Sequence, residues 1–302
     1  MNWFALATIG HLANAGAFLI DKTLLSSALK RSATYAALIS SFSFLALVAT
    51  PWVSRWPRAS SLWMAIAFGA IFVFALWAFF EALRRAEATR VVPVVGSLIP
   101  VFTFLGTFTL LGERLTARLL AGYAFLIVAI FFLTFGARRQ ASNRKSFLLS
   151  LLAALLFAIS SLLGKMAYTD APFLGAFIIS RVSAGVVGLL MIFSFSAVRN
   201  EIIGMFRKKS LTNQRVAPLA ILGQMMGASG FVLVHLALAS GSAPIVNSLQ
   251  ALQYAFLVLC AWFGGARVAR ALHEERTKKS FIIKSAAIVL VGMGLYLIGS
   301  AV

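Results

Sequence analysis

Long apolar runs follow one another along almost the whole chain and are separated by short polar segments. About 20 apolar residues in a helix cross the hydrocarbon core of a bilayer. The runs do not alternate in the period of two that a transmembrane strand requires. The pattern therefore predicts an all-α polytopic membrane protein. The ten predicted spans are residues 2–20, 33–53, 61–80, 91–111, 117–136, 146–167, 173–196, 216–238, 243–263 and 281–300.

Composition gives the same answer by a separate argument. Hydrophobic residues make up 61% of the chain and charged residues 12%, and the mean hydropathy is +0.94. A soluble domain carries roughly 25% charged residues, so we expect lipid to be the solvent and the bilayer to be a partner. No basic segment precedes the first apolar run, which predicts a retained first helix and not a cleaved signal peptide.

The net charge of +19 has two interpretations, a nucleic-acid partner or a set of basic cytoplasmic loops. The basic residues lie in short loops between apolar spans, so we expect no nucleic-acid partner and a multi-pass protein of the cytoplasmic (inner) cell membrane. Loops after even-numbered spans hold only Arg55, Arg58, Arg114 and Arg118, and Lys165 and Arg181 lie in or at the ends of helices. All other Lys and Arg residues follow odd-numbered spans, which predicts both termini outside the cytoplasm.

The two halves of the sequence resemble each other. The end of the first span, Ile20-Asp21-Lys22, is similar to the end of the sixth, Leu163-Gly164-Lys165. The ninth span can be aligned with the fourth span in two registers, and both remain open. In one register residues 252–256 correspond to 98–102; in the other Pro244 and Ser248 correspond to Pro93 and Ser97. We predict two five-helix repeats, 1–138 and 145–302. Because five is odd, the repeats must be inverted in the membrane, an architecture typical of secondary transporters.

Several short motifs carry a family resemblance. They are Ala82-Leu83-Arg84, then Ser97 to Phe102 with Pro100, then Gly112-Glu113-Arg114-Leu115-Thr116, and in the second half Ser180-Arg181-Val182. With these motifs the chain resembles EamA-type members of the drug/metabolite transporter superfamily. The resemblance implies a ten-helix transporter whose central cavity opens to one side at a time, with both termini inside, and it implies no particular substrate. The second half departs from the Gly-Glu-Arg turn at His273-Glu274-Glu275-Arg276.

Polar side chains recur at helical spacing on single faces of four predicted spans. Such side chains are costly in hydrocarbon and face the bundle interior. Together with Arg181 they are the substrate-binding candidates: His11, Asn14, Ser161, Lys165, Arg181, Gln224, His235, Asn247, Gln250 and Tyr254. The alternative is that they are interhelical packing contacts. For Lys165 and Arg181 an ion pair around Asp170 is a further alternative, and Lys165 at a helix end also fits snorkelling to the interface. Pro100 is interpreted as a hinge or gate, with a static kink left open.

Catalytic chemistry finds little support. The carboxylates all lie at or near loops, the histidines are scattered, and Cys260 is the only cysteine, so we expect no catalytic residue, no metal and no cofactor. The phosphate-cradling loop of an ATPase does not occur. We predict a secondary transporter of a small metabolite by alternating access. The candidate interior charges, Lys165, Arg181 and His235, favour an anionic or zwitterionic solute such as an amino acid. The alternatives are a non-transporting scaffold or regulatory subunit and, less favoured, a membrane-embedded enzyme. Whether the chain forms a homodimer is left open.

Overall fold

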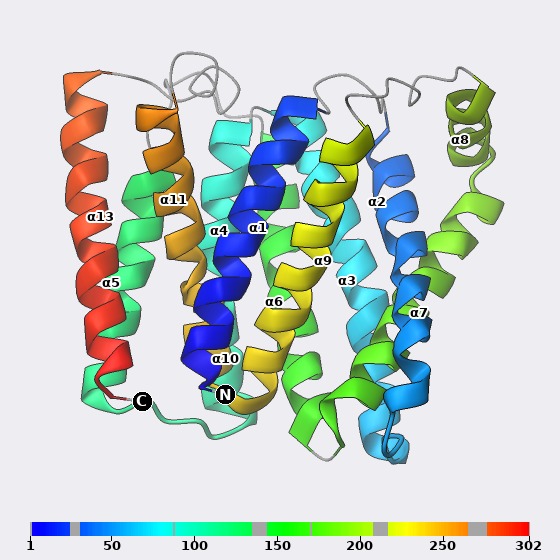
Figure 1. Ribbon diagram of the computed structural model, residues 1–302, viewed down its shortest axis with the longest axis horizontal. Coiled ribbons are helices and arrows are strands. Elements are labelled where there is room, and N and C mark those ends of the chain that lie inside the picture. Colours follow the sequence, from blue (N-terminus) through cyan, green and yellow to red (C-terminus); the bar gives the residue numbers. More distant parts are fainter. Residues whose placement is uncertain are drawn as a thin grey trace. The chain divides into compact units, whose positions relative to one another are not determined.

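The computed structural model describes residues 2–24, 31–86, 88–134, 144–169, 171–207, 217–264 and 277–301, and over these ranges the chain consists of helices and short connections (Figure 1). No strand occurs in them, so the predicted all-α class is confirmed for that part of the chain. By its internal contacts the chain divides into two compact units, and each unit combines segments of both sequence halves. This division does not test the predicted repeats 1–138 and 145–302, which describe internal similarity.

The first unit contains Met1–Ser26, Ala88–Ala141 and Thr212–Val302. Its helices are α1 (Trp3–Leu24), α4 (Ala88–Leu110), α5 (Ala117–Thr134), α9 (Ala217–Ser240), α10 (Ala243–Ser248), α11 (Gln250–Phe263) and α13 (Lys278–Gly299). Helix α1 lies along α9, and α5 lies along α13 (Figure 1). Near the chain termini, Gly241 packs on Trp3 and Gly299 on Phe4. Both ends of the described chain therefore lie at the same end of this unit.

The second unit contains Ser27–Glu87 and Ser142–Leu211. Its helices are α2 (Ser32–Ser41), the 3₁₀ helix η1 (Phe42–Trp52), α3 (Ala59–Arg85), α6 (Arg144–Thr169), α7 (Phe173–Ser194) and α8 (Ser196–Arg207). Helix α3 lies along α6, and α7 packs against α2, η1 and α3. Where α2, α3, α7 and α8 meet, small and aliphatic side chains form a buried cluster that includes Ala36, Val73 and Ala184.

Glycines set the closest helix approaches in both units. Gly10 of α1 faces Gly230 of α9, Gly122 of α5 faces Gly294 of α13, and Gly69 of α3 lies against the backbone of Ser180 in α7. Lipid removes most of the hydrophobic drive between helices, so dispersion contacts between closely spaced backbones supply much of the attraction. A side chain at any of these glycines would separate the pair.

Eight helical segments of the described chain are long and apolar enough to cross a membrane. They match predicted spans one to three and six to ten. The fourth and fifth predicted spans correspond to shorter apolar helices, Val94–Leu110 and Ala117–Leu133. A membrane-embedded, multi-pass helical chain is thus confirmed, while the number ten and the inversion of the repeats stay predictions.

Three local features differ from uninterrupted apolar spans. The second span is α-helical only to Ser41 and continues as η1, which contains Pro51 and therefore lacks one backbone donor. The ninth span has a 3₁₀-like step at Leu249, whose carbonyl accepts from Leu252 N–H at 3.0 Å. Helix α8 was not predicted, since it follows the seventh predicted span in a stretch expected to be a loop. Its apolar residues form only one stripe, which a continuous apolar run does not reveal.

Candidate functional site

The substrate-binding candidates are divided between the two units. The first unit holds His11, Asn14, Gln224, His235, Asn247, Gln250 and Tyr254, together with Pro100, and the second holds Ser161, Lys165 and Arg181.

The two candidates on α1 both contact other helices of the first unit. His11 is buried, and its Nε2 donates to the carbonyl oxygen of Val246 in α10 at 2.9 Å. Asn14, one turn later, places its side-chain oxygen against Gly230 of α9. The polar face that the sequence predicts for this helix is thus directed at protein, although at two different neighbours.

The candidates on α10 and α11 lie on either side of the step at Leu249. Asn247 Nδ2 donates to Thr103 Oγ1 of α4 at 3.0 Å, and Gln250 Nε2 donates to the Tyr254 hydroxyl at 2.9 Å. The Tyr254 hydroxyl in turn abuts Gly96 of α4. These contacts form a polar seam between α4 and the broken ninth span. Irregular backbone at membrane depth occurs where protein or a cavity covers it, which fits this position.

Pro100 is buried in α4 on the same seam. A proline has no N–H, so the carbonyl of Gly96, four residues earlier, loses its usual helical donor. The Tyr254 hydroxyl lies against that glycine. The part of α4 that lacks this hydrogen bond and Tyr254, a candidate substrate-binding side chain, are therefore neighbours, although they lie in different halves of the sequence.

The two candidates on α9 have different surroundings. His235 is buried, stacks on Phe231 with 3.9 Å between ring centroids, and donates from Nδ1 to the Phe231 carbonyl at 2.8 Å. The side chain of Gln224 is exposed. His235 is thus held by its own helix, whereas Gln224 presents its amide at the surface.

Arg181 of α7 lies in an aromatic enclosure in the second unit. It is buried, with its guanidinium carbon 5.0 Å from the ring centre of Phe68 and 4.9 Å from that of Phe72, both in α3. Cation–π attraction of this kind is stronger where water is excluded. Ser161 and Lys165 of α6 are half-buried. Asp170, the expected ion-pair partner, lies outside the described residues.

Some polar positions were not among the sequence candidates. Thr103 was missed because one threonine in an apolar run is an ordinary helix residue. Lys284, grouped with the loop cations by its sequence position, lies in α13 and is buried. The carboxylate of Glu81 at the end of α3 accepts hydrogen bonds from Arg84 and Arg85. In the part of the chain that the structure describes, no cluster of three or more His, Cys, Asp or Glu could hold a metal ion.

The candidates do not line either of two pockets that the described residues form. One, of about 880 Å³, lies in the second unit between α2, α3 and α6, and the other, of about 450 Å³, lies beside Leu19, Cys260 and Phe263 in the first unit. The cavity expected between the polar faces therefore stays a prediction.

Comparisons with known proteins agree with this architecture. A solved structure described only as a crystal structure of a protein matches 98% of this chain and 95% of its own, with a TM-score of 0.66 and 16% sequence identity. At that identity the likeness concerns the fold alone. No curated protein matches the sequence. The model of the EamA-like transporter family matches residues 1–135. This match covers slightly less than half of the chain, so the chain is similar to the EamA-like transporters over residues 1–135.

Proposed function

We propose that the protein is a secondary transporter that moves a small metabolite across the cytoplasmic membrane by alternating access. The observation that carries the proposal is the match of residues 1–135 to a transporter family. Polar side chains inside apolar helices support it, because hydrocarbon tolerates such groups mainly where they pair or bind a solute. His11 and the Asn247–Thr103 pair are examples.

The proposal includes ten spans arranged as two inverted five-helix repeats. If the two repeats are equivalent, the first span corresponds to the sixth, and the third span corresponds to the eighth. Helix α1 packs along α9, and the exchanged pair, α6 and α3, also packs together. The pairs α5–α13 and α2–α7 exchange into themselves, and each is in contact. This correspondence supports a twofold relation between the repeats.

The preferred solute is anionic or zwitterionic, such as an amino acid. Arg181 supports this choice, because it is a buried cation among the rings of Phe68 and Phe72. A cationic solute near such a group would be repelled, and the low local dielectric would strengthen the repulsion. A carboxylate would instead gain a counter-charge.

The test is solute flux into liposomes that contain the purified protein. Matched anionic, zwitterionic, neutral and cationic solutes are compared, with protein-free liposomes as the control. We expect saturable uptake of an amino or carboxylic acid. Robust transport of a quaternary ammonium dye that amino and carboxylic acids do not inhibit would refute the substrate class. Absence of flux for every solute in a metabolite library would favour the scaffold or regulatory role.

A further inference from the structure

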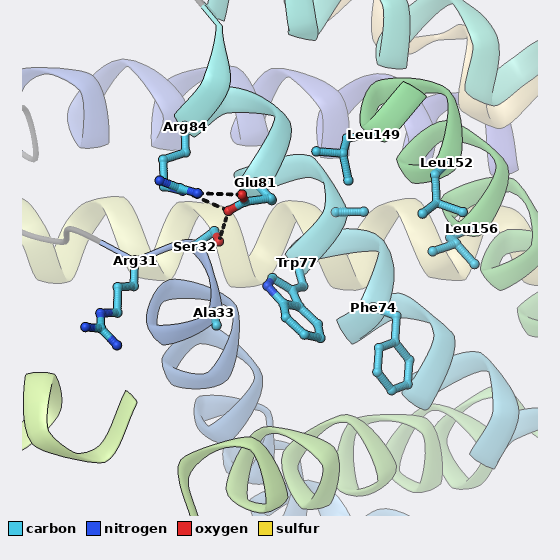
Figure 2. A pocket seen from close by; sticks show the side chains of 11 residues that line it. Arg31, Ser32, Ala33, Phe74, Trp77, Glu81, Arg84, Leu149, Leu152 and Leu156 are labelled. Carbon is cyan, nitrogen blue, oxygen red and sulfur yellow. Dashed lines mark hydrogen bonds and ion pairs between the residues drawn. The ribbon is translucent and has the colours of Figure 1, made fainter. Parts of the chain in front are cut away.

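The pocket of about 880 Å³ in the second unit has two ends of different chemistry (Figure 2). One end is apolar and is lined by side chains of α3 and α6, namely Phe74, Trp77, Leu149, Leu152 and Leu156. The other end is polar and is lined by Arg31, Ser32, Glu81 and Arg84. None of these residues is a substrate-binding candidate from the sequence. The pocket is therefore amphipathic and distinct from the predicted transport site.

The apolar end lies within membrane spans. Helices α3 and α6 are both long and apolar enough to cross a bilayer. Phe74 and Leu152 are each 45% exposed, so their surfaces require an apolar covering. Along α3, Phe74 lies two turns before Glu81, or about 10 Å at 1.5 Å per residue. The pocket thus extends from the charged end of α3 toward the hydrocarbon.

The polar end is built on Glu81. Its carboxylate accepts from Ser32 Oγ at 2.6 Å, from Arg84 Nη2 at 2.7 Å and from Arg85 Nε at 2.7 Å. Ser32 begins α2, so the Glu81 carboxylate connects α2 to α3 at the polar end of the pocket. One carboxylate cannot balance two guanidinium groups, which leaves a positive charge at the end of the pocket.

Neighbouring residues increase that positive charge. Arg31 contacts Glu201 only at 4.0 Å, and its side chain is 55% exposed. Arg144 and Lys145 begin α6 beside the end of α3, since Ser146 Oγ donates to the Ala82 carbonyl at 3.0 Å. Among the described residues where these spans end, the cations thus outnumber the carboxylates of Glu81 and Glu201. An arginine has several N–H donors, so Arg84 can bond an anion while it is bonded to Glu81.

We propose that this pocket binds an anionic phospholipid, whose phosphate contacts Arg31 and Arg84 and whose acyl chain lies against Trp77 and Leu152. Basic pockets between transmembrane helices select anionic headgroups by this chemistry. A soluble anion would leave the apolar end uncovered, whereas a lipid occupies both ends. The site does not depend on which solute is transported, or on whether any is.

Trp77 provides a direct measurement. The chain has six tryptophans, and replacing the other five by Phe leaves Trp77 as the only indole. This protein is placed in phosphatidylcholine vesicles that contain a small fraction of phosphatidylglycerol or phosphatidylcholine with brominated acyl chains. Because bromine quenches tryptophan on contact, we expect Trp77 to be quenched at a several-fold lower mole fraction of the anionic lipid.

Matched variants make the test specific. A protein that retains only Trp63, which is 68% exposed near the other end of α3, is expected to show no headgroup preference. Arg84→Gln and Arg31→Gln should abolish the preference at Trp77, while Arg58→Gln, at the opposite end of α3, should leave it unchanged. Arg31 makes the weaker ion pair, so its variant carries the test if Arg84→Gln fails to fold. Equal quenching by both lipids, or a preference that survives Arg31→Gln, would overturn the proposal.

Discussion

Single side chains in this protein act mainly through contacts between helices. His11 connects α1 to α10 through a backbone carbonyl, and Asn247 connects α10 to α4 through Thr103. A buried polar group without such a partner in hydrocarbon would cost several kcal/mol. The same side chains are the candidates for binding a solute, so their packing and transport roles must be separated by experiment.

The Asn247–Thr103 pair is expected to contribute to stability. Asn247→Leu and Thr103→Val should each lower the melting temperature, and the double variant should lose less than the sum. The expected coupling is about 0.6–1.7 kcal/mol, the range for interhelical hydrogen bonds in membranes. Thermal unfolding in detergent measures it. Gln224→Leu is the control, because the side chain of Gln224 is exposed and its loss should reduce transport with little change in stability. Additive effects of Asn247→Leu and Thr103→Val would contradict the pair.

The cations of the second unit are expected to determine the preference for solute charge. Arg181→Gln and Lys165→Gln should each weaken uptake of an amino or carboxylic acid more than that of a neutral sugar, because each removes a counter-charge. Liposome flux with competing solutes measures this ratio. Arg199→Gln, an exposed position in α8, is the matched control. Equal loss of both solutes would assign Arg181 and Lys165 a structural role.

At the scale of elements, two features shape the packing of the helices: close contacts between helices at glycines, and interruptions of the helical hydrogen bonds. Glycines allow α1 to meet α9 and α3 to meet α7, and Pro100 and Leu249 interrupt regular bonding where α4 faces α10 and α11. Motions during transport are expected to use the irregular segments.

Gly69 is expected to be needed for the crossing of α3 and α7. An added Cβ would collide with the Ser180 carbonyl, which is backbone and cannot rotate away. Gly69→Ala should therefore destabilise the protein by about 1–3 kcal/mol, as overpacking does. Gly292→Ala in α13 is the control, because a Cβ there meets no atom within 4 Å. Equal melting temperatures for the two variants would disprove the close crossing.

Pro100 is expected to act as a hinge. Pro100→Ala restores a donor for the Gly96 carbonyl, so the melting temperature should rise while the maximal flux falls and solute binding persists. Stopped-flow uptake together with equilibrium binding measures the two effects separately. Flux that is unchanged in a stabilised Pro100→Ala protein would make Pro100 a static kink.

At the scale of the whole molecule, the loops after even-numbered spans are poor in basic residues, and the chain termini lie beside one of these loops. Loops after even-numbered spans hold only Arg55, Arg58, Arg114 and Arg118, and in the first unit Trp3 packs on Gly241 and Phe4 on Gly299. The termini thus lie beside a connection with no basic residue. Charge distribution and family resemblance predict opposite orientations, and we follow the charges.

Both termini are expected outside the cytoplasm. In a Cys260→Ser background, Ser300→Cys should react with a membrane-impermeant thiol reagent added to intact cells, and Ser210→Cys should react only after permeabilisation. The physical reason is that Lys and Arg are retained on the cytoplasmic side. Strong external labelling of Ser210→Cys, without labelling of Ser300→Cys, would establish the reverse orientation.

The sequence alone was sufficient for the all-α class of the protein, for the placement of most spans and for the similarity of residues 1–135 to a transporter family. A lipid-exposed backbone must satisfy its own hydrogen bonds, which limits spanning segments to helices and closed barrels. The apolar runs are too long for barrel strands and lack their period of two, so they indicate helices. The short motifs near Pro100 and Gly112 carried the family resemblance. Each motif consists of residues adjacent in the chain, so it can be recognised without the tertiary structure.

Contacts between distant residues were decided only by the tertiary structure. Helical spacing placed His11 and Asn14 on one face of α1, but it could not show that one meets α10 and the other α9. Thr103, the aromatic enclosure of Arg181 and the pocket at Glu81 likewise join residues far apart in the sequence. Periodicity reports which side of a helix is polar, whereas the partner of that side depends on how several helices pack together. That packing is set by the sum of many weak contacts, which no single segment contains.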